Sequence, residues 1–444
     1  MSEIDTPGAP ASRAGSALQR VFWRLHFWAG LLTAPLVLFA AFTGLLYVFT
    51  PQIEARLHAG VDRVPAGTSI AQLDAQVAAA RAAQPGWSVR SVLVTPTPGA
   101  TTQVLLAPPA GPGAHAGHAG GHDPGLPRGR IVYVDPATAR VVGSLAEMER
   151  FGTWAKKLHS SALQGQAWRW PIELAASWML LMLATGVAMW WARRPLAGGS
   201  GRARWRRWHA RVGIVAGGLL AVVLLTGLTW SGQAGERFRA AQRALDQSSP
   251  QPPRDLRSAA RGDTDPLAMQ AILERARAEL PSDLPLLLAP PRPPDGVWRI
   301  DVQAGSRPTA RATLALDAGD GRVLYRSGWD ELPLLARATA IGIPLHRGEF
   351  GGWNQALLVV VALAAIFSVV SGVSMWWLRR PAGRWGAPPV GAAQWRSVPV
   401  GLWALAALLA WALPVFGVSV LVFAALELIV AASRRLRLPP PAAA

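Results

Sequence analysis

The chain has 444 residues, 51% of them hydrophobic, and 44 basic side chains against 26 acidic ones give it a formal net charge of +18. It contains no cysteine, eight histidines and 21 tryptophans. Iron–sulfur clusters, zinc–cysteine sites, disulfide frameworks and thiol nucleophiles are therefore excluded, because each of them needs cysteine sulfur. A disordered polyelectrolyte is also excluded, since half of the residues are apolar and available for burial.

Long apolar runs dominate the chain. Four of them have the length of one membrane helix, which needs about 20 residues: residues 25–50, 171–192, 212–232 and 354–378. A fifth run, residues 398–433, is too long for one crossing and has Pro414 and Gly417 near its middle, so we expect two short helices joined by a tight turn. The pattern predicts an α-helical integral membrane protein with about six transmembrane helices.

The basic residues gather in short segments beside these runs. Residues 193–211 carry seven arginines and no acid, and residues 379–397 carry four arginines and no acid. Together with residues 1–24 and 434–444 they hold 17 basic and 2 acidic residues, a net charge of +15. Basic loops stay in the cytoplasm, so we expect both termini there in a multi-pass protein of the bacterial inner membrane. The positive charge then indicates the orientation of the chain in the membrane. The expected partner is the lipid bilayer and not nucleic acid.

Two long segments, residues 51–170 and 233–353, are left for the periplasmic side. Each opens with a helical stretch, at residues 70–83 and 267–279. Short β-rich runs follow at residues 89–94, 103–106 and 131–134 in the first segment and at 297–302 and 312–316 in the second. Each segment ends in a hairpin-like turn. We predict two small α+β domains.

The two halves of the chain share landmarks at near-constant spacing. The first copy is His26, Gly30, Thr43 and Gly44, and the second is His209, Gly213, Thr226 and Gly227. The offsets from each histidine are the same, at +4, +17 and +18. Further along, His159 precedes a Met-Trp-Trp-Ala-Arg-Arg-Pro segment, and His346 precedes Met-Trp-Trp-Leu-Arg-Arg-Pro. We therefore expect a duplicated parallel repeat, related by an axis along the membrane normal.

This repeat arranges four histidines in two layers. His26 and His209 begin the outward helices and lie near the cytoplasmic face, whereas His159 and His346 precede the returning helices and lie near the outer face. Two symmetry-related histidines that face each other across an axis can supply both axial ligands of one haem. A histidine at a membrane edge is a functional hypothesis by default, although a satisfied hydrogen-bonding residue is the simpler reading of any single one.

Glycines accompany the histidines on one helix face, since 18 residues make about five turns. Gly30 and Gly44 share a face with His26, and Gly213 and Gly227 share one with His209. Such a stripe lets a flat group approach the backbone, or else it serves close helix packing alone. The returning segments from His159 and His346 are too long for one straight helix, and Pro171 and Gly351-Gly352 offer bends.

Other polar residues leave alternatives open. The Gly/His/Pro-rich residues 111–125 contain His115, His118 and His122, which form either a flexible loop or a metal site outside the membrane. Glu173 and Glu427 are either proton carriers or packing residues. Lys156 and Lys157, the chain's only lysines, are adjacent and could attract an anionic partner.

The motifs Arg24-Leu-His-Phe-Trp-Ala-Gly, Leu-His and Met-Trp-Trp-x-Arg-Arg-Pro resemble the PepSY-associated transmembrane family over about residues 15–385. The two outside domains are similar to PepSY domains. Some members are ferric-siderophore reductases with two b-type haems, so the resemblance implies one haem on His26 and His209 and another on His159 and His346. No catalytic residue separate from these ligands is indicated.

The expected function is transfer of electrons from the cytoplasmic side to a periplasmic acceptor, with reduction of a ferric siderophore or other iron chelate in iron uptake. One-electron reduction to Fe(II) weakens binding by hard oxygen ligands and releases the metal. The electron donor is a cytoplasmic partner or a quinol, since no strand–GxGxxG–helix segment is present. The alternatives are a non-catalytic PepSY regulator of a periplasmic peptidase or of iron uptake, and a transporter component.

Overall fold

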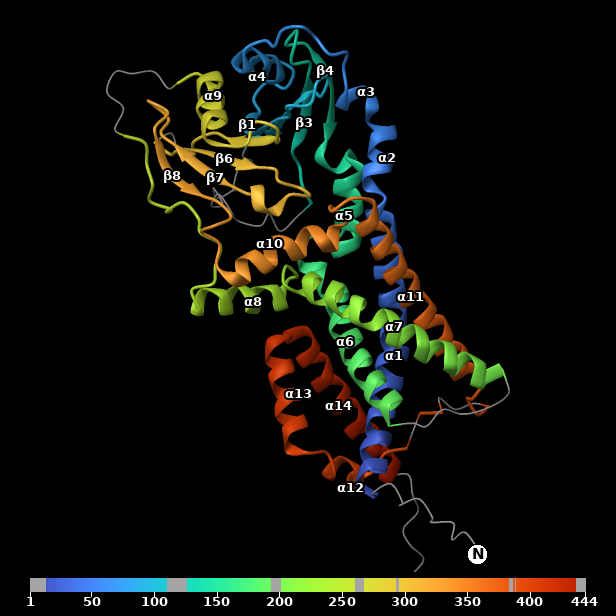
Figure 1. Cartoon of the computed structure of the whole chain (residues 1–444). Coiled ribbons are helices and arrows are strands. Elements are labelled where there is room, and N and C mark those ends of the chain that lie inside the picture. The colour runs from blue at the N-terminus through green and yellow to red at the C-terminus, as the bar shows by residue number, and fades with distance from the viewer. Residues whose placement is uncertain are drawn as a thin grey trace, which may run out of the picture. The chain divides into compact units, whose positions relative to one another are not determined.

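A computed structural model of the chain describes residues 13–109, 126–192, 201–259, 267–292, 295–382, 386–387 and 389–436. The chain divides into two compact units. The helical unit consists of residues 1–42, 170–238 and 360–444, and the sheet unit of residues 43–169 and 239–359. Helices α1 (Arg13–Val48), α8 (Gln233–Ala244) and α11 (Gly352–Trp377) contribute residues to both units (Figure 1).

Within the described residues, four helices are long and apolar enough to cross a membrane. Their spans are Ala17–Val48, Gln166–Trp191, Gly201–Leu228 and Gly352–Trp377. They contain α1, α6 (Trp170–Trp191), α7 (Gly201–Leu228) and α11. The prediction of a multi-pass helical membrane protein is confirmed. Helix α7 begins well inside the predicted basic loop, so part of that arginine-rich segment is helical.

The C-terminal apolar run forms two helices, α13 (Val400–Ala412) and α14 (Pro414–Leu436), after the short helix α12 (Ala392–Arg396). Gly417 is needed at their turn, because an added Cβ would lie 2.6 Å from the carbonyl oxygen of Ala410. The predicted total of six membrane helices is not confirmed. Helix α13 has 13 residues, which rise about 20 Å against a hydrocarbon core of about 30 Å.

Glu173 joins two helices of the helical unit. Its side chain is buried, and its carboxylate accepts hydrogen bonds from the backbone N–H groups of Gln233 and Ala234, both at 2.9 Å. These residues begin α8. A carboxylate at a helix N-terminus satisfies N–H groups that have no partner within the helix. Of the two roles that the sequence leaves open for Glu173, this contact favours packing.

The sheet unit contains, within the described residues, one antiparallel sheet of eight strands in the order β4-β3-β2-β1-β5-β6-β7-β8. The strands are β1 (Ser88–Val94), β2 (Thr102–Ala107), β3 (Arg130–Val134), β4 (Val141–Ala146), β5 (Leu286–Ala289), β6 (Trp298–Val302), β7 (Thr313–Leu316) and β8 (Val323–Ser327). The two halves of the sheet have the same strand sequence outward from the centre, and β1 pairs with β5 where they meet.

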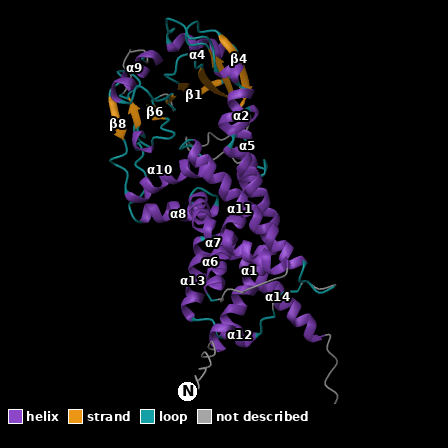
Figure 2. Ribbon diagram, turned by 45° about the vertical axis from the view of Figure 1, so that its right-hand side comes forward, coloured by secondary structure: helices purple, strands orange, loops and turns teal. Residues whose placement is uncertain are grey.

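Helices α4 (Leu73–Ala82) and α9 (Met269–Glu279) pack on this sheet and share one apolar core with it (Figures 1 and 2). The carboxylate of Asp74 accepts the N–H groups of Met269 and Gln270 at 2.8 and 2.9 Å, which caps α9. In return, the N–H of Leu73 donates to the side-chain oxygen of Gln270 at 3.0 Å. The two halves of the sheet unit are therefore joined by these hydrogen bonds, by the common apolar core and by the pairing of β1 with β5.

The predicted helices and β-rich runs of both outside segments are confirmed, and both predicted hairpin turns connect paired strands, β3 with β4 and β7 with β8. Strand β5 is an addition to the prediction. The pairing of β1 with β5 also differs from the expectation of two separate domains, because it makes one sheet from them.

The outer histidines lie on short helices of the sheet unit, α5 (Phe151–Ser161) and α10 (Leu334–Arg347). The remaining short elements are α2 (Thr50–Leu57), α3 (Ala59–Asp62), η1 (Glu147–Glu149), η2 (Gln166–Arg169) and η3 (Pro308–Ala310). The expected bends exist, but the first falls at Ala162 and Leu163, which have left-handed backbones, whereas Pro171 lies in the first turn of α6. The second falls at Gly348 and Gly351, with φ values of +76° and +85°.

Candidate functional site

The two histidines predicted near the cytoplasmic face lie together in the helical unit. His26 of α1 and His209 of α7 have ring centres 6.2 Å apart, with the ring planes at 82°. The chain separates them by more than 180 residues, so the fold alone brings them together.

The two histidines predicted near the outer face lie together in the sheet unit. His159 of α5 and His346 of α10 have ring centres 6.5 Å apart, with the ring planes at 47°. The pairing inferred from the repeat is thus the pairing that the fold makes.

Both separations suit one metal between two imidazoles. A metal–imidazole bond is about 2.0 Å long and the ring centre lies roughly 1.1 Å beyond the bound nitrogen, so two rings that held one metal between them would have centres about 6.2 Å apart. A direct hydrogen bond between two imidazoles would need one ring to donate to the other, whereas His26 and His209 both have a hydroxyl oxygen at Nδ1.

Neighbouring hydroxyl groups set that state in the helical unit. Nδ1 of His26 lies 3.1 Å from the hydroxyl oxygen of Thr185, which donates its own hydrogen to the carbonyl of Leu181 at 2.8 Å. Nδ1 of His209 lies 2.8 Å from the hydroxyl of Ser371, which donates to the carbonyl of Ser368 at 3.1 Å. A hydroxyl that donates to its helix carbonyl accepts a hydrogen bond from Nδ1 of the ring. In that arrangement Nε2 is a lone pair, the form that binds a metal.

In the sheet unit, Nδ1 of His159 lies 2.9 Å from the hydroxyl of Thr43. Thr43 belongs to the predicted landmark set, and its hydroxyl is placed as those of Thr185 and Ser371 are. Three of the four histidines therefore have Nδ1 held by a hydroxyl group. A second hydrogen bond of this kind orients a metal-binding histidine and fixes its tautomer.

A glycine follows each of these hydroxyl residues and faces the same histidine. An added Cβ would lie 3.3 Å from His26 at Gly186, 3.4 Å from His159 at Gly44 and 3.8 Å from His209 at Gly372. The missing side chains let each ring lie close to the neighbouring helix. A flat macrocycle held by these rings would need small neighbours of this kind.

The other predicted glycines are placed differently. An added Cβ at Gly30 would lie 3.5 Å from Sδ of Met182, so Gly30 packs against α6 rather than against a histidine. At Gly213 an added Cβ would meet no atom within 4 Å. Gly227 lies at the end of α7, next to Thr226, which bonds back to the carbonyls of Val222 and Val223 at 2.8 and 3.0 Å.

The sequence does contain a signal for the residues that were missed. A hydroxyl residue followed by glycine occurs as Thr43-Gly44, Thr185-Gly186, Thr226-Gly227 and Ser371-Gly372, and the second and fourth pairs stand three residues before the two Met-Trp-Trp motifs. The prediction used the first and third pairs only. The inner histidines are contacted by the second and fourth.

Cationic side chains stand beside the outer pair. Lys156 lies one turn before His159 on α5, and Arg347 follows His346 directly on α10. Burial and the charges of Arg347, Lys157 and Arg169 lower the pKa of Lys156, against the opposing effect of Glu349, although part of the lysine side chain remains exposed. Arg347 itself bonds to Glu349 at 2.8 Å and to the hydroxyl of Tyr47 at 3.1 Å. Positive charge thus exceeds negative charge around these histidines.

Of the four remaining histidines, only His58 lies within the described residues. His115, His118 and His122 lie outside the described residues. Nε2 of His58 accepts the N–H of Phe151 at 3.4 Å, a contact at the start of α5. Among the described residues, no group of three or more His, Asp or Glu side chains is placed to hold a bare metal ion.

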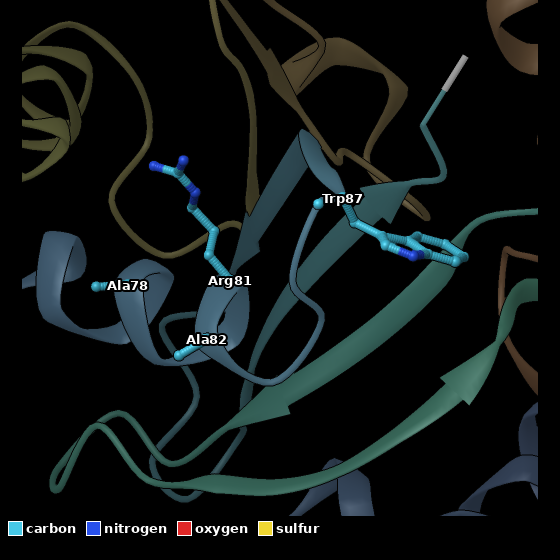
Figure 3. Close-up of a pocket in the computed structure, with 5 residues that line it drawn as sticks. Ala78, Arg81, Ala82 and Trp87 are labelled. Atoms are coloured by element: carbon cyan, nitrogen blue, oxygen red, sulfur yellow. The ribbon is translucent and has the colours of Figure 1, made fainter. Parts of the chain in front are cut away.

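A surface hollow of about 480 Å³ on the sheet unit is lined by Ala78, Arg81, Ala82, Gly86 and Trp87. Figure 3 shows the side chains of Arg81 and Trp87 pointing away from each other. They do not converge on a common ligand, so the hollow is not a candidate site.

The fold and its histidine pairs define a class: a multi-pass helical membrane protein with an α+β sheet unit and paired histidines. The sequence matches the family model described as the PepSY-associated TM region over residues 23–379, and the chain belongs to that family. No protein with a curated description matches it.

Proposed function

We propose that the chain is a di-haem electron-transfer protein of the bacterial inner membrane that reduces a ferric siderophore, or another ferric chelate, on the periplasmic side. The observation that carries the proposal is the pair of ring separations, 6.2 and 6.5 Å, in two places predicted from the repeat. Either separation alone would fit an ordinary aromatic contact. Both together, with Nδ1 tethered in three of the four rings, favour metal ligation.

Each residue has a defined part in holding the groups. His26 and His209 would bind one haem, and His159 and His346 the other, each through Nε2. When bound, two haems supply one-electron carriers whose potential depends on axial ligation, nearby hydrogen bonds and burial. Thr185, Ser371 and Thr43 orient the rings, and Gly186, Gly372 and Gly44 leave space beside them. Helix α1 carries residues of both sites.

The orientation rests on the arginines. The predicted cytoplasmic segments hold a net +15, and by the positive-inside rule this charge supports a periplasmic sheet unit. The excess of cations beside His159 and His346 supports an anionic acceptor there, such as a chelate with carboxylate groups. The duplicated repeat supports electron transfer through two similar sites in series.

Absorption spectroscopy of the purified protein tests the proposal. We expect a Soret band that sharpens and shifts on reduction with dithionite, together with a haem content of about two per chain by the pyridine haemochrome assay. Both His26→Ala and His346→Ala should lower the haem content, whereas the control His58→Ala should not. Absence of a Soret band, or a band indifferent to both variants, would leave the non-catalytic regulator as the better assignment.

The acceptor needs its own measurement. Protein reduced with dithionite and freed of excess reductant should be reoxidised by a ferric hydroxamate or ferric citrate, with Fe(II) trapped by ferrozine. If the reduced bands persist with every ferric chelate offered, electron transfer stands and the reductase assignment is withdrawn.

A further inference from the structure

Helices α1, α6 and α14 of the helical unit enclose an apolar cavity of about 120 Å³. Its lining includes Leu25, Ala29 and Thr33 of α1, Trp178 of α6, and Ser419 and Phe423 of α14. The matched family region ends at residue 379, so α14 lies beyond it. The cavity is therefore made in part by a segment that the family match does not cover.

We propose that this cavity binds the headgroup of a membrane quinol, which donates electrons to the carrier at His26 and His209. The inference rests on the proposed function and adds the electron donor to it. Leu25 and Ala29, which line the cavity, lie within one turn of His26 along α1.

The size and walls of the cavity suit a single six-membered ring. An apolar cavity of about 150 Å³ in another protein holds one benzene molecule. The cavity here is somewhat smaller, at about 120 Å³, so it accepts part of a quinol ring and leaves the rest at its open rim. The indole of Trp178 forms one wall, and it is fixed by a hydrogen bond to Ser419 at 2.9 Å and by an edge contact with Phe416 at 5.0 Å. At the rim, Leu32 is 56% exposed, which gives an isoprenoid tail a path to the bilayer.

The polar atoms of the lining favour the reduced form of the ligand. The hydroxyl of Thr33 donates to the carbonyl of Ala29 at 2.7 Å, and the hydroxyl of Ser419 donates to the carbonyl of Phe416 at 2.7 Å. The oxygen of Thr33 then keeps its lone pairs, and the oxygen of Ser419, which also accepts the indole N–H of Trp178, keeps one. A quinol offers two O–H donors to such acceptors, whereas a quinone offers only acceptors.

An ion pair lies within one turn of the cavity. Arg24, next to Leu25, contacts the carboxylate of Glu427, which is one turn beyond Phe423 on α14. An ionisable residue within an apolar helix is expensive and marks a functional site by default. The sequence leaves two roles for Glu427, a proton carrier or a packing residue. Its position one turn from the cavity suits a base that accepts protons from the quinol.

The oxidation balances as QH₂ → Q + 2 H⁺ + 2 e⁻. Both O–H bonds of the quinol break, and the ring becomes the quinone. The protons pass by way of the Glu427 carboxylate to the cytoplasm. The two electrons leave one at a time, and a haem held by His26 and His209 would supply the one-electron acceptor.

Photolabelling measures binding directly. The full chain in nanodiscs of phosphatidylethanolamine and phosphatidylglycerol is labelled with an azido-ubiquinol analogue, and the labelled peptides are mapped by mass spectrometry. We expect labels on the peptides that carry residues 24–33 and 416–427, and competition by decylubiquinol. The variant Ala29→Phe fills the cavity and should reduce labelling by about tenfold or more. The control Val215→Phe adds the same ring at a position of α7 that is 81% exposed, and it should leave labelling unchanged.

Ser419→Ala provides a second variant in case Ala29→Phe disturbs folding. It removes one acceptor and also the hydrogen-bond partner of the Trp178 indole, and labelling should fall several-fold. Equal labelling of Ala29→Phe, Ser419→Ala and Val215→Phe would overturn the proposal, as would competition by added phospholipid but not by decylubiquinol. The Soret band of each sample is recorded separately. A missing haem band with intact labelling defeats the electron-transfer function, whereas a normal haem band without labelling defeats the quinol site.

Discussion

The hydroxyl oxygen of Thr185 lies 3.1 Å from Nδ1 of His26, and the hydroxyl of Ser371 stands in the same relation to His209 at 2.8 Å. Each hydroxyl comes from α6 or α11 and contacts the histidine of α1 or α7. Both hydroxyl groups also lie within hydrogen-bond distance of a carbonyl of their own helix. A hydroxyl that donates to its helix carbonyl accepts from Nδ1, which leaves Nε2 of the ring for a ligand.

Replacement of Thr185 by valine should weaken haem binding at the inner site. Valine keeps the shape and removes the acceptor, so the His26 ring loses its orientation and its fixed tautomer. Loss of such a partner typically costs about 10- to 100-fold in affinity. Haem transfer to apomyoglobin measures the change, and a redox titration should show a shifted potential for one haem only.

The variant Ser177→Ala is the matched control for that measurement. Ser177 is also buried on α6. Its hydroxyl donates to the carbonyl of Glu173 at 2.7 Å, a helix carbonyl and not a histidine ring. Thr185→Ser should restore wild-type binding. If Thr185→Val and Ser177→Ala bind haem equally well, the hydroxyl has no part in holding it.

The sequence predicts the histidines, but it does not predict Thr185 and Ser371, the hydroxyl partners of His26 and His209. The histidines are recognised by their spacing along the chain, which does not depend on which helices are in contact. The partners of His26 and His209 lie on α6 and α11, more than 150 residues away, and only helix packing decides which face meets them. Likewise, periodicity predicts the strands, but the pairing of β1 with β5 depends on contacts that no local pattern encodes.

The position of Gly186 predicts a selective loss of the inner haem. An added Cβ would lie 3.3 Å from Cε1 of His26, and the two further carbons of valine would press on the ring. We expect Gly186→Val to lose about half of the haem, with the outer site intact. The pyridine haemochrome assay counts the haem that remains.

Gly218→Val is the corresponding control, because an added Cβ there meets nothing within 4 Å. It carries the same change of helix propensity, which favours valine over glycine by a few tenths of a kcal/mol in either variant. Full haem content in Gly186→Val would show that the space beside His26 is not used.

Arg150 should be a main source of stability at the start of α5. Its guanidinium bonds to Glu54 and Asp62, both at 2.7 Å, and to the hydroxyl of Tyr133 at 3.2 Å. Removal of one partner from a buried ion pair costs 3–5 kcal/mol, and partial exposure lowers our expectation for Arg150→Ala to about 2–3 kcal/mol. Thermal unfolding of the protein in detergent measures this loss.

Arg140→Ala removes an exposed arginine from the neighbouring hairpin and should change stability by no more than about 0.5 kcal/mol. Arg150→Ala should also loosen α5 and with it His159, so the outer haem is lost more readily than the inner one. A melting temperature that falls equally in both variants would contradict the specific role of Arg150.

Lys156 should make the binding of an anionic chelate depend on pH. Burial, then the charges of Arg347, Lys157 and Arg169, lower its pKa from the ordinary value of 10.5. As the pH rises through this lowered pKa, the ammonium loses its proton and its attraction for the anion, so affinity falls. The free energy of unfolding moves in the opposite direction. The folded protein holds this proton less tightly than the unfolded chain does, so it gains stability as the pH rises from the lowered pKa to 10.5.

Titration with ferric citrate between neutral and alkaline pH should show the falling affinity in the wild type. We expect Lys156→Gln to bind about fivefold more weakly at neutral pH, the loss of about 1 kcal/mol, and to show a flatter pH profile. Arg326→Gln removes one charge from a distant, 58% exposed side chain and should retain the wild-type profile. Identical profiles for Lys156→Gln and the wild type would show that the anion binds elsewhere.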